Sequence, residues 1–313
     1  MIQEVDSALS EMKEEILQGL QNEQKVIPSK YLYDTKGSEL FEEITHLQEY
    51  YPTRTEISIL QNNMQEIVNM VGSNVLLAEL GSGSSRKTRM LLDNLSRPAA
   101  YVPIDISSEY LTHVVSQLQD DYSGLEVLPL CADYTKPFHL PNTSSTYNRT
   151  VLFYPGSTIG NFIPEKAHTF LGSLSRQLES GDGFLIGIDL KKDKKVLEKA
   201  YNDSQGTTAR FNKNILRHIN KKLCANFSLA NFQHRAFYNT SVGRIEMHLV
   251  STTHQEVTIS GERITILKGE SIHTENSYKY SLDEFYKLIQ PYFSIKKNWL
   301  DPKRYFAVLL LEK

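Results

Sequence analysis

A short acidic and glycine-rich segment is the first place in this chain where residue types and spacing suggest chemistry. The apolar run at 74–80 ends in Glu79 and Leu80 and is followed directly by Gly81, Ser82 and Gly83. Glycines at such a position let the backbone turn sharply and approach a ligand without interference from a Cβ atom. Because open α/β sheets bind ligands at the carboxyl ends of their strands, this segment predicts a ligand-binding turn.

Three kinds of ligand compete for this turn. A phosphate-binding loop needs a glycine directly before Lys87 and Thr88, where the chain has Arg86. A dinucleotide site needs a third glycine at that same place. The acid two residues before Gly81 suits a cationic ligand such as S-adenosylmethionine, whose sulfonium and amino groups attract a carboxylate. We favour the third interpretation.

The next two predicted strands also end in acids. Asp105 closes YVPID, where a carboxylate can accept hydrogen bonds from both hydroxyls of a ribose. Asp133 and Tyr134 close the following strand, where an acid can accept a bond from the adenine amino group and a ring can stack. Each aspartate alone could equally be a turn residue or a helix cap. Three acid-bearing strand ends in succession favour S-adenosylmethionine more strongly than any single motif.

Alternating strand and helix patterns position these residues. After the strand at 74–80 come predicted strands at 99–106, 125–134 and 181–190, and segment 150–162 is a strand that ends in a glycine-rich loop; helices alternate with most of these strands. Apolar strands separated by helices indicate a parallel sheet covered on both faces. The predicted fold class is therefore α/β, a doubly wound core with a smaller α+β cap or insertion domain.

Four segments follow from the pattern along the chain. Residues 1–58 form an N-terminal helical segment, and residues 59–190 form the Rossmann-like core that binds the cofactor. Residues 191–288 are a polar insertion with helical and alternating strand patterns, and residues 289–313 supply the final strands of the core sheet. We expect segment 1–58 and the insertion to form a substrate cap over the ligand edge.

Composition narrows the class of protein. The chain has 313 residues, 40% of them hydrophobic, and a net charge of -3 from interspersed acids and bases, so nothing attracts it generally to nucleic acid or membrane. No apolar run reaches about 20 residues, and the N-terminus lacks the pattern of a signal peptide. Cys131, Cys224 and the nine histidines lack metal-ligand spacing. We expect a monomeric cytoplasmic enzyme with a small-molecule partner and no metal.

Longer stretches resemble one enzyme family. They are KYLYDTKGSELFEEIT, QEYYPTRTE, ELGSGSSRKTRMLLD, FYPGSTIGNF, AYNDSQGTTARFNKNIL, RIEMHL and GESIHTENSYKY. They run through nearly the whole chain in the family's order, and the last four are specific to this family rather than to methyltransferases at large. On these stretches the chain resembles the histidine-specific N-methyltransferases of ergothioneine biosynthesis, which have a class I S-adenosylmethionine-dependent core.

The resemblance implies a reaction and a set of contacts. The α-amino group of L-histidine would be methylated three times to give hercynine, with S-adenosylmethionine as cofactor and S-adenosylhomocysteine as its product. Tyr33 would lie close to the reacting centre. Cofactor contacts carry over to Gly81, Lys87, Asp105, Asp133 and Tyr134. Substrate contacts carry over to Tyr50, Asn161, Tyr201, Glu275, Asn276 and Ser277, with Phe41, Gly156, Thr208 and Met247 as further candidates for the pocket wall.

The types of these residues suit histidine, although each also has an ordinary structural explanation. Asn161 and Tyr201 can donate to the carboxylate, but Asn161 could instead cap the helix that begins near Pro164. Glu275 can accept an imidazole N–H and Ser277 can bind the ring's other nitrogen, but the two alternate along a strand and could form one solvated face. Tyr50 and Tyr201 could be ordinary half-buried aromatics. Met247 could simply pack in the core, and Lys87 could be a surface residue on a helix.

The implied reaction requires mainly orientation. The neutral amine attacks the sulfonium methyl in line, and positioning the reactants can supply about 7–11 kcal/mol. Water, Tyr33 or the substrate's own equilibrium could remove the proton of the amine. Three alternatives remain: a methyltransferase of this family for another amino acid such as a tryptophan derivative, a nicotinamide-dependent oxidoreductase, and a catalytically silent binding module. An indole-selective pocket would not need the pair of Glu275 and Ser277.

Overall fold

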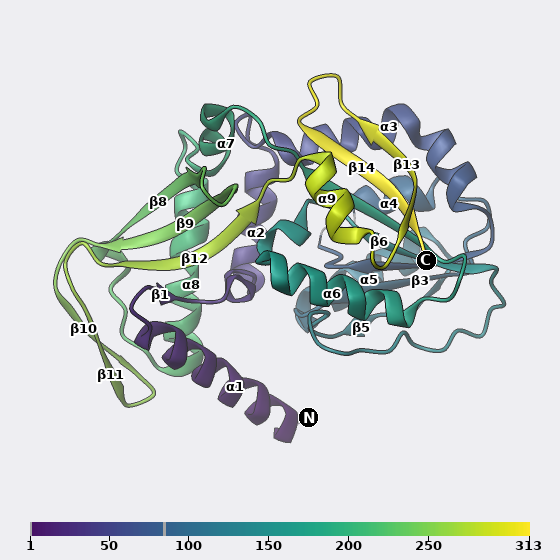
Figure 1. The fold of residues 1–313 in the computed structure, drawn as a ribbon. Coiled ribbons are helices and arrows are strands. Elements are labelled where there is room, and N and C mark those ends of the chain that lie inside the picture. The colour runs from purple at the N-terminus through teal and green to yellow at the C-terminus, as the bar shows by residue number, and fades with distance from the viewer. Residues whose placement is uncertain (1, 84–85) are drawn as a thin grey trace. The chain divides into compact units, whose positions relative to one another are not determined.

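In the computed structural model, which describes residues 2–83 and 86–313, the chain folds into two units (Figure 1). Unit 1 combines Met1–Tyr50 with Asp193–Ser277, and unit 2 combines Tyr51–Lys192 with Tyr278–Lys313. Ser84 and Ser85 of the predicted glycine turn lie outside the described residues. Each unit therefore joins segments that are distant in the sequence.

A mixed sheet forms the centre of unit 2. Among the described residues it has eight strands in the order β13-β14-β7-β6-β2-β3-β4, with β5 also paired to β3. Strands β7, β6, β2, β3, β4 and β5 are parallel, whereas β14 and β13 are antiparallel to their neighbours. The strands are β2 (Val75–Leu80), β3 (Ala100–Asp105), β4 (Glu126–Val127), β5 (Leu130–Cys131), β6 (Arg149–Tyr154), β7 (Gly183–Asp189), β13 (Ser294–Leu300) and β14 (Phe306–Glu312).

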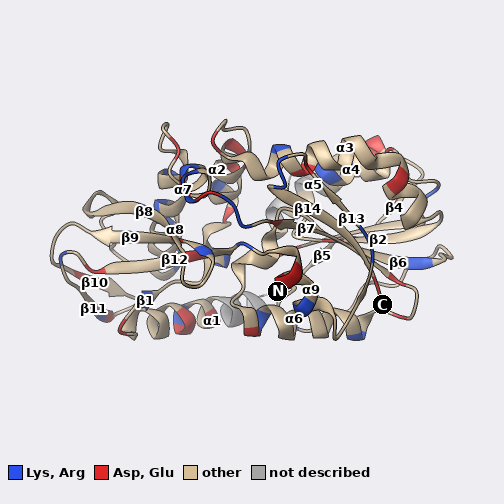
Figure 2. Ribbon diagram, turned by 45° about the horizontal axis from the view of Figure 1, so that its top comes forward, with Lys and Arg blue, Asp and Glu red and all other residues tan. Residues whose placement is uncertain are grey.

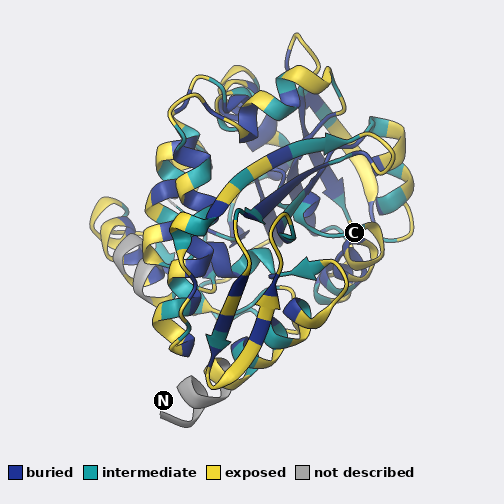
Figure 3. Cartoon of the chain, turned by 90° about the vertical axis from the view of Figure 1, so that its left-hand side faces the viewer, coloured by how far each residue is buried: buried dark blue, intermediate teal, exposed yellow. Residues whose placement is uncertain are grey.

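Helices cover both faces of this sheet. Leu77 and Tyr101 pack on one face with apolar residues of α3, α4 and α5. Leu76 and Ala78 pack on the other face with α6 and α9. The helices are α3 (Tyr51–Val71), α4 (Arg86–Leu92), α5 (Ser108–Asp121), α6 (Pro164–Gln177) and α9 (Leu282–Ile289), with a short 3-10 helix η2 (Thr158–Asn161). The predicted doubly wound α/β core is confirmed, and nearly all residues of its parallel strands β2, β3, β6 and β7 are buried (Figure 3).

One predicted strand differs in detail from the observed ones. The predicted strand at 125–134 is interrupted and forms the short strands β4 and β5. The segment 150–162 is a strand that ends in a glycine-rich loop, as predicted: β6 ends at Tyr154, and Gly156 and Ser157 adopt positive φ angles of 80° and 60° that turn the chain. The two strands predicted at the C-terminus are β13 and β14, which extend the sheet beyond β7.

A second sheet organises unit 1. Its order is β1-β12-β9-β8, and β1 pairs in parallel with β12, so the N-terminal segment adds a strand to a sheet made by the insertion. The strands are β1 (Lys25–Val26), β8 (Phe232–Asn239), β9 (Arg244–Ser251) and β12 (Ser271–Tyr278), and a separate hairpin contains β10 (Gln255–Ile259) and β11 (Glu262–Ile266). The helices are α1 (Ile2–Gln21), α2 (Thr35–Thr45), α7 (Lys194–Tyr201) and α8 (Thr207–Leu223), with η1 (Ser29–Leu32) and η3 (Leu229–Asn231).

Charged residues are interspersed along the elements of both units (Figure 2). This distribution agrees with the small net charge of -3. None of the described helices is long and apolar enough to span a bilayer.

Candidate functional site

The predicted cofactor residues of unit 2 follow neighbouring parallel strands. Leu80 is in register with Ile104 and Asp105 with Cys131, so Gly81, Asp105 and Asp133 lie at the carboxyl ends of β2, β3 and β5. The N–H of Gly81 donates to the carbonyl of Ile104 at 2.8 Å, which fixes the start of the turn. The sheet thus brings these three residues to one edge, where open α/β sheets bind their ligands.

The glycine turn needs its glycines. Gly81 and Gly83 have φ angles of +75° and +42°, a region that residues with a Cβ rarely adopt. A Cβ at Gly81 would lie 3.6 Å from Cε1 of Tyr134, so the Tyr134 ring lies against the turn. The backbone of Gly83 also donates to the carboxylate of Asp105. The structure therefore joins the turn directly to two of the predicted cofactor contacts.

The two aspartates combine a turn role with a position at the ligand edge. Asp105 accepts the N–H of Ser107 at 3.0 Å, and Asp133 accepts the N–H of Thr135 at 3.0 Å and its hydroxyl at 2.5 Å. Burial raises the pKa of Asp105 above its usual value, against the opposing effect of the backbone donors. The local bonds hold each carboxylate in a defined orientation.

Tyr134 presents a ring that neighbouring aromatics fix in place. Its ring centroid lies 5.8 Å from that of Tyr154 and 6.0 Å from that of Phe170. Burial raises the pKa of its phenol to about 12, so the ring stays neutral at physiological pH. A fixed neutral ring beside Gly81 suits stacking on a base.

Glu79, the acid that favoured a cationic cofactor, lies inside the core of unit 2. It is 2% exposed, and its carboxylate accepts a hydrogen bond from Tyr101 at 2.5 Å and another from the hydroxyl of Thr88. Burial raises the pKa of Glu79 to about 7, although both hydroxyls favour the charged form. Any attraction of Glu79 for a bound cation therefore comes from a carboxylate that is buried in the core, two residues before the glycine turn.

Replacing Glu79 by glutamine is expected to flatten the pH dependence of unfolding. Because the folded-state pKa is raised above its usual value, the folded protein binds more protons than the unfolded chain between about pH 4.5 and 7. The wild type should lose about 3 kcal/mol of unfolding free energy relative to the variant as pH rises through this window. Urea unfolding at several pH values measures this; a difference that is constant with pH would contradict the buried acid.

Lys87 is not a surface residue. Its Nζ lies 2.5 Å from Oε2 of Glu56, and the two side chains are 16% and 1% exposed. Glu56, which comes from α3, also accepts the N–H of Gly156 at 2.9 and 3.1 Å. No sequence pattern singled out Glu56, although it lies in the matching stretch QEYYPTRTE. One carboxylate therefore joins a predicted cofactor contact to a predicted pocket wall.

Asn161 is the last residue of η2, in the loop after β6. The N-cap of α6 is Ile163, so the explanation of Asn161 as a helix cap is wrong. Its neighbour Gly160 approaches the backbone of Tyr278 so closely that a Cβ would lie 2.7 Å from the Tyr278 carbonyl oxygen. This contact fixes the loop that carries Asn161.

Aromatic rings form a continuous row in unit 1. Tyr33 lies at the end of η1, with its ring 5.6 Å from Phe41 and 5.4 Å from Phe211. Phe41 contacts Tyr50 at 6.1 Å, and Tyr50 contacts Tyr201 at 6.1 Å. The fold thus brings four predicted site residues together, and adds Phe211, which lies in the matching stretch AYNDSQGTTARFNKNIL.

The row ends at strand β12. The hydroxyl of Tyr201 donates to Oγ of Ser277 at 2.8 Å, and the two residues are 7% and 5% exposed. Ser277 is therefore not on a solvated face. Glu275 is half-buried and lies on the same face of the strand, because side chains alternate along a strand. Between them, Oδ1 of Asn276 is buried and accepts no hydrogen bond from any described residue.

The remaining predicted substrate residues are placed differently. Thr208 is 3% exposed near the start of α8, where its N–H donates to Asp203 at 2.7 Å. Met247 is 1% exposed on β9, as core packing would require. Gly156 and Asn161 belong to unit 2, whereas the other predicted substrate residues belong to unit 1.

A buried asparagine supports this part of unit 1. Asn212 is fully buried, donates to Nδ1 of His234 at 2.9 Å and accepts the hydroxyl of Thr274 at 2.6 Å. Since Nδ1 of His234 accepts, its Nε2 donates to the carbonyl of Tyr201 at 2.8 Å. Burial lowers the pKa of His234, which keeps this neutral form. Through these hydrogen bonds the network holds the backbone of Tyr201 and residue Thr274 of β12 in place.

One cluster in unit 1 contains ligand types that metals prefer. Donor atoms of Glu246, His248 and His273 all lie within 4.8 Å of one another. The two rings are stacked 4.6 Å apart at 8°, so their nitrogens do not converge on one point, since an imidazole binds a metal in the plane of its ring. Arg244 pairs with Glu246 at 2.8 Å. The geometry is that of a packed charge network.

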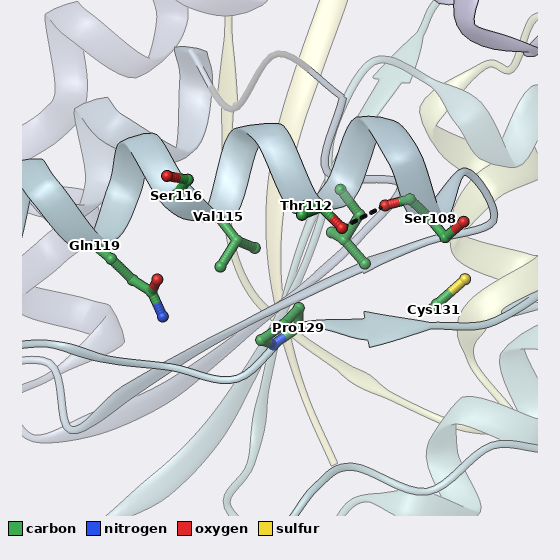
Figure 4. Close-up of a pocket in the computed structure, with 8 residues that line it drawn as sticks. Ser108, Thr112, Val115, Ser116, Gln119, Pro129 and Cys131 are labelled. Carbon is green, nitrogen blue, oxygen red and sulfur yellow. Dashed lines mark hydrogen bonds between the residues drawn. The ribbon is translucent and has the colours of Figure 1, made fainter.

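A pocket of about 320 Å³ lies between α5 and the segment that contains β5 (Figure 4). Its lining combines apolar, hydroxyl, amide and thiol side chains, from Ser108, Leu111, Thr112, Val115, Ser116, Gln119, Pro129 and Cys131. None of the predicted cofactor or substrate residues is among these described lining residues. We assign it no role in the reaction.

Comparison with known proteins identifies the family. A model of the histidine-specific, S-adenosylmethionine-dependent methyltransferases matches residues 12–313. Histidine N-alpha-methyltransferase of Mycolicibacterium smegmatis is 37% identical over 97% of this chain and 96% of its own length, and that of Mycobacterium tuberculosis is 40% identical over 86% and 84%. The structure of a possible exported protein from Bordetella parapertussis, 8% identical, matches with a TM-score of 0.50 over 99% of this chain and 96% of its own and shows likeness of fold alone. The chain therefore belongs to the histidine-specific, S-adenosylmethionine-dependent methyltransferases.

Proposed function

We propose that this protein transfers methyl groups from S-adenosylmethionine to the α-amino group of L-histidine. The observation that carries the proposal is the buried hydrogen bond from Tyr201 to Ser277, with Glu275 on the same face of β12. The two relatives named above, both histidine N-alpha-methyltransferases, support the same substrate.

The residues divide into a cofactor set and a substrate set. In unit 2, Asp105 would accept the ribose hydroxyls, Asp133 and Tyr134 would hold the adenine, and Gly81 and Lys87 would contact the amino acid end of the cofactor. When bound, the cofactor supplies an electrophilic methyl group on a sulfonium. This set fits such a ligand, because it combines carboxylates, a fixed ring and an unhindered backbone turn.

In unit 1, the substrate set would recognise the imidazole by its two nitrogens. Glu275 would accept one ring N–H, and Ser277, oriented by Tyr201, would bind the other nitrogen. The neutral amine would attack the sulfonium methyl with its lone pair, forming the new C–N bond while the C–S bond breaks and its electrons stay on sulfur. The amine would lose one proton before each of the three attacks, and water, Tyr33 or the substrate's own equilibrium could take it.

Mass spectrometry of the products tests the proposal. Histidine incubated with excess S-adenosylmethionine is expected to become hercynine, its trimethylated form, with three molecules of S-adenosylhomocysteine formed for each histidine. Tryptophan is the comparison substrate, because an indole offers no second ring nitrogen for Ser277. A product that stalls at one methyl group would refute trimethylation, and turnover of tryptophan without turnover of histidine would refute the substrate.

We also propose that the enzyme acts as a monomer in the cytoplasm. Support for the location comes from Cys131 and Cys224, which are exposed free thiols and suit a reducing compartment. Sedimentation at working concentration tests the monomer, and fractionation of cells tests the location.

A further inference from the structure

We propose that Glu56 is a positioning residue, which aims the Lys87 ammonium at the amino acid end of the cofactor and ties it to the loop at Gly156. This inference rests on the proposed function, since it assigns Lys87 to the cofactor. Glu56 itself touches neither reactant in this assignment and acts through its two partners.

The contacts of Glu56 involve three separate segments of unit 2. Its Oε2 lies 2.5 Å from Nζ of Lys87 at the start of α4. Its two oxygens lie 2.9 and 3.1 Å from the N–H of Gly156, in the loop after β6. A Cβ at Gly156 would lie 3.6 Å from Nζ of Lys87, so the ammonium lies directly beside that loop. Charge-assisted bonds of this kind are stronger and more directional than neutral ones.

The fold reserves space for this carboxylate. A Cβ at Gly187 of β7 would lie only 2.0 Å from Oε1 of Glu56, so the strand leaves a gap that only glycine provides. Glu56 is 1% exposed, and a buried carboxylate is costly unless it is paired and hydrogen-bonded. Lys87 and Gly156 supply that pairing, which makes their positions mutually dependent.

Substitution by glutamine separates the charge from the shape. An amide oxygen can still accept the N–H of Gly156, but the amide NH₂ would then meet the Lys87 ammonium, donor against donor. Lys87 should therefore leave its position while the loop keeps its bond. If Glu56 served only folding, the effect of its substitution on cofactor binding would be the same with and without Lys87.

A double-mutant cycle measures this dependence. Binding of S-adenosylhomocysteine is measured by calorimetry on the full chain as wild type, Glu56→Gln, Lys87→Met and the double variant. Glu56→Gln should weaken binding about tenfold in the wild type and less than about twofold in the Lys87→Met background. The control Glu312→Gln, which removes the surface partner of Lys296, should leave binding unchanged.

The outcomes distinguish the inference from the function on which it rests. Equal losses in both backgrounds, or no loss in either, would overturn the positioning role while leaving the cofactor assignment intact. Absence of any binding to wild type would overturn both. If Glu56→Gln unfolds too easily for calorimetry, Glu56→Asp keeps the charge but shortens the reach, and the same cycle then decides between coupled and additive effects.

Discussion

Replacing Glu275 by alanine is expected to lower kcat/KM for L-histidine by about 100-fold or more, with affinity for S-adenosylhomocysteine changed by less than about twofold. In the proposed site Glu275 accepts an imidazole N–H, and without it this donor is left unpaired in a half-buried site. A charged partner strengthens the bond that is lost. Initial rates at varied histidine concentration, together with calorimetry for the cofactor product, measure the two effects separately.

The matched control for this variant is Glu262→Ala. Glu262 is an exposed carboxylate on β11 of the same unit, so its loss should change neither quantity measurably. Glu275→Gln keeps an acceptor without the charge and should fall between wild type and Glu275→Ala. Equal losses of histidine turnover and cofactor affinity in Glu275→Ala would argue against the assigned role.

Replacing Asp189 by asparagine is expected to lower the free energy of unfolding by about 3–5 kcal/mol. Asp189 at the end of β7 is fully buried and binds Lys192 at 2.5 Å and Lys279 at 2.8 Å. The hydroxyl of Tyr51 donates to it at 2.7 and 2.8 Å. The substitution leaves two buried ammonium groups without their counter-charge. Urea unfolding followed by circular dichroism measures the loss.

The same carboxylate sets a pH dependence. Burial alone would raise the pKa of Asp189, but the charges of Lys279 and Lys192 outweigh it and hold the pKa below its usual value. Its contribution to stability is therefore complete above the unfolded-state pKa of about 4 and is lost as pH falls through the lower folded-state pKa. As a control, Glu312→Gln removes a surface ion pair of unit 2 and should cost less than about 1 kcal/mol. A loss for Asp189→Asn as small as that would contradict the buried network.

The three partners of Asp189 lie next to the points where the chain passes between the units. Tyr51 is the first residue of unit 2 after its boundary at Tyr50, Lys192 is the last residue before the next boundary, and Lys279 follows the third closely. The buried carboxylate of Asp189 therefore binds one residue of unit 2 beside each of the three points where the chain enters or leaves this unit. No motif in the sequence marks Asp189, because Tyr51 and Lys279 are distant from it along the chain and only the fold brings them to its carboxylate.

The sequence by itself determined the features that depend on neighbouring residues. Apolar runs predicted β2, β3, β7 and the final strands, and the pattern of acids and glycines at strand ends predicted that Gly81, Asp105 and Asp133 share one edge. Strand periodicity and turn chemistry are local, and parallel strands necessarily place their carboxyl ends together. Membership of the methyltransferase family could likewise be inferred from motifs in order.

Only the tertiary structure decided which polar residues that are distant along the chain form hydrogen bonds and ion pairs with one another. Glu56 lies 31 positions from Lys87 and 100 from Gly156, and Asn212 is 62 positions from Thr274. A buried carboxylate or amide within an apolar helix pattern gives no sign of its partner, because desolvation and pairing depend on what the fold places beside it. For the same physical reason, Tyr201 and Ser277, 76 positions apart, could be named from the family but paired only from the structure.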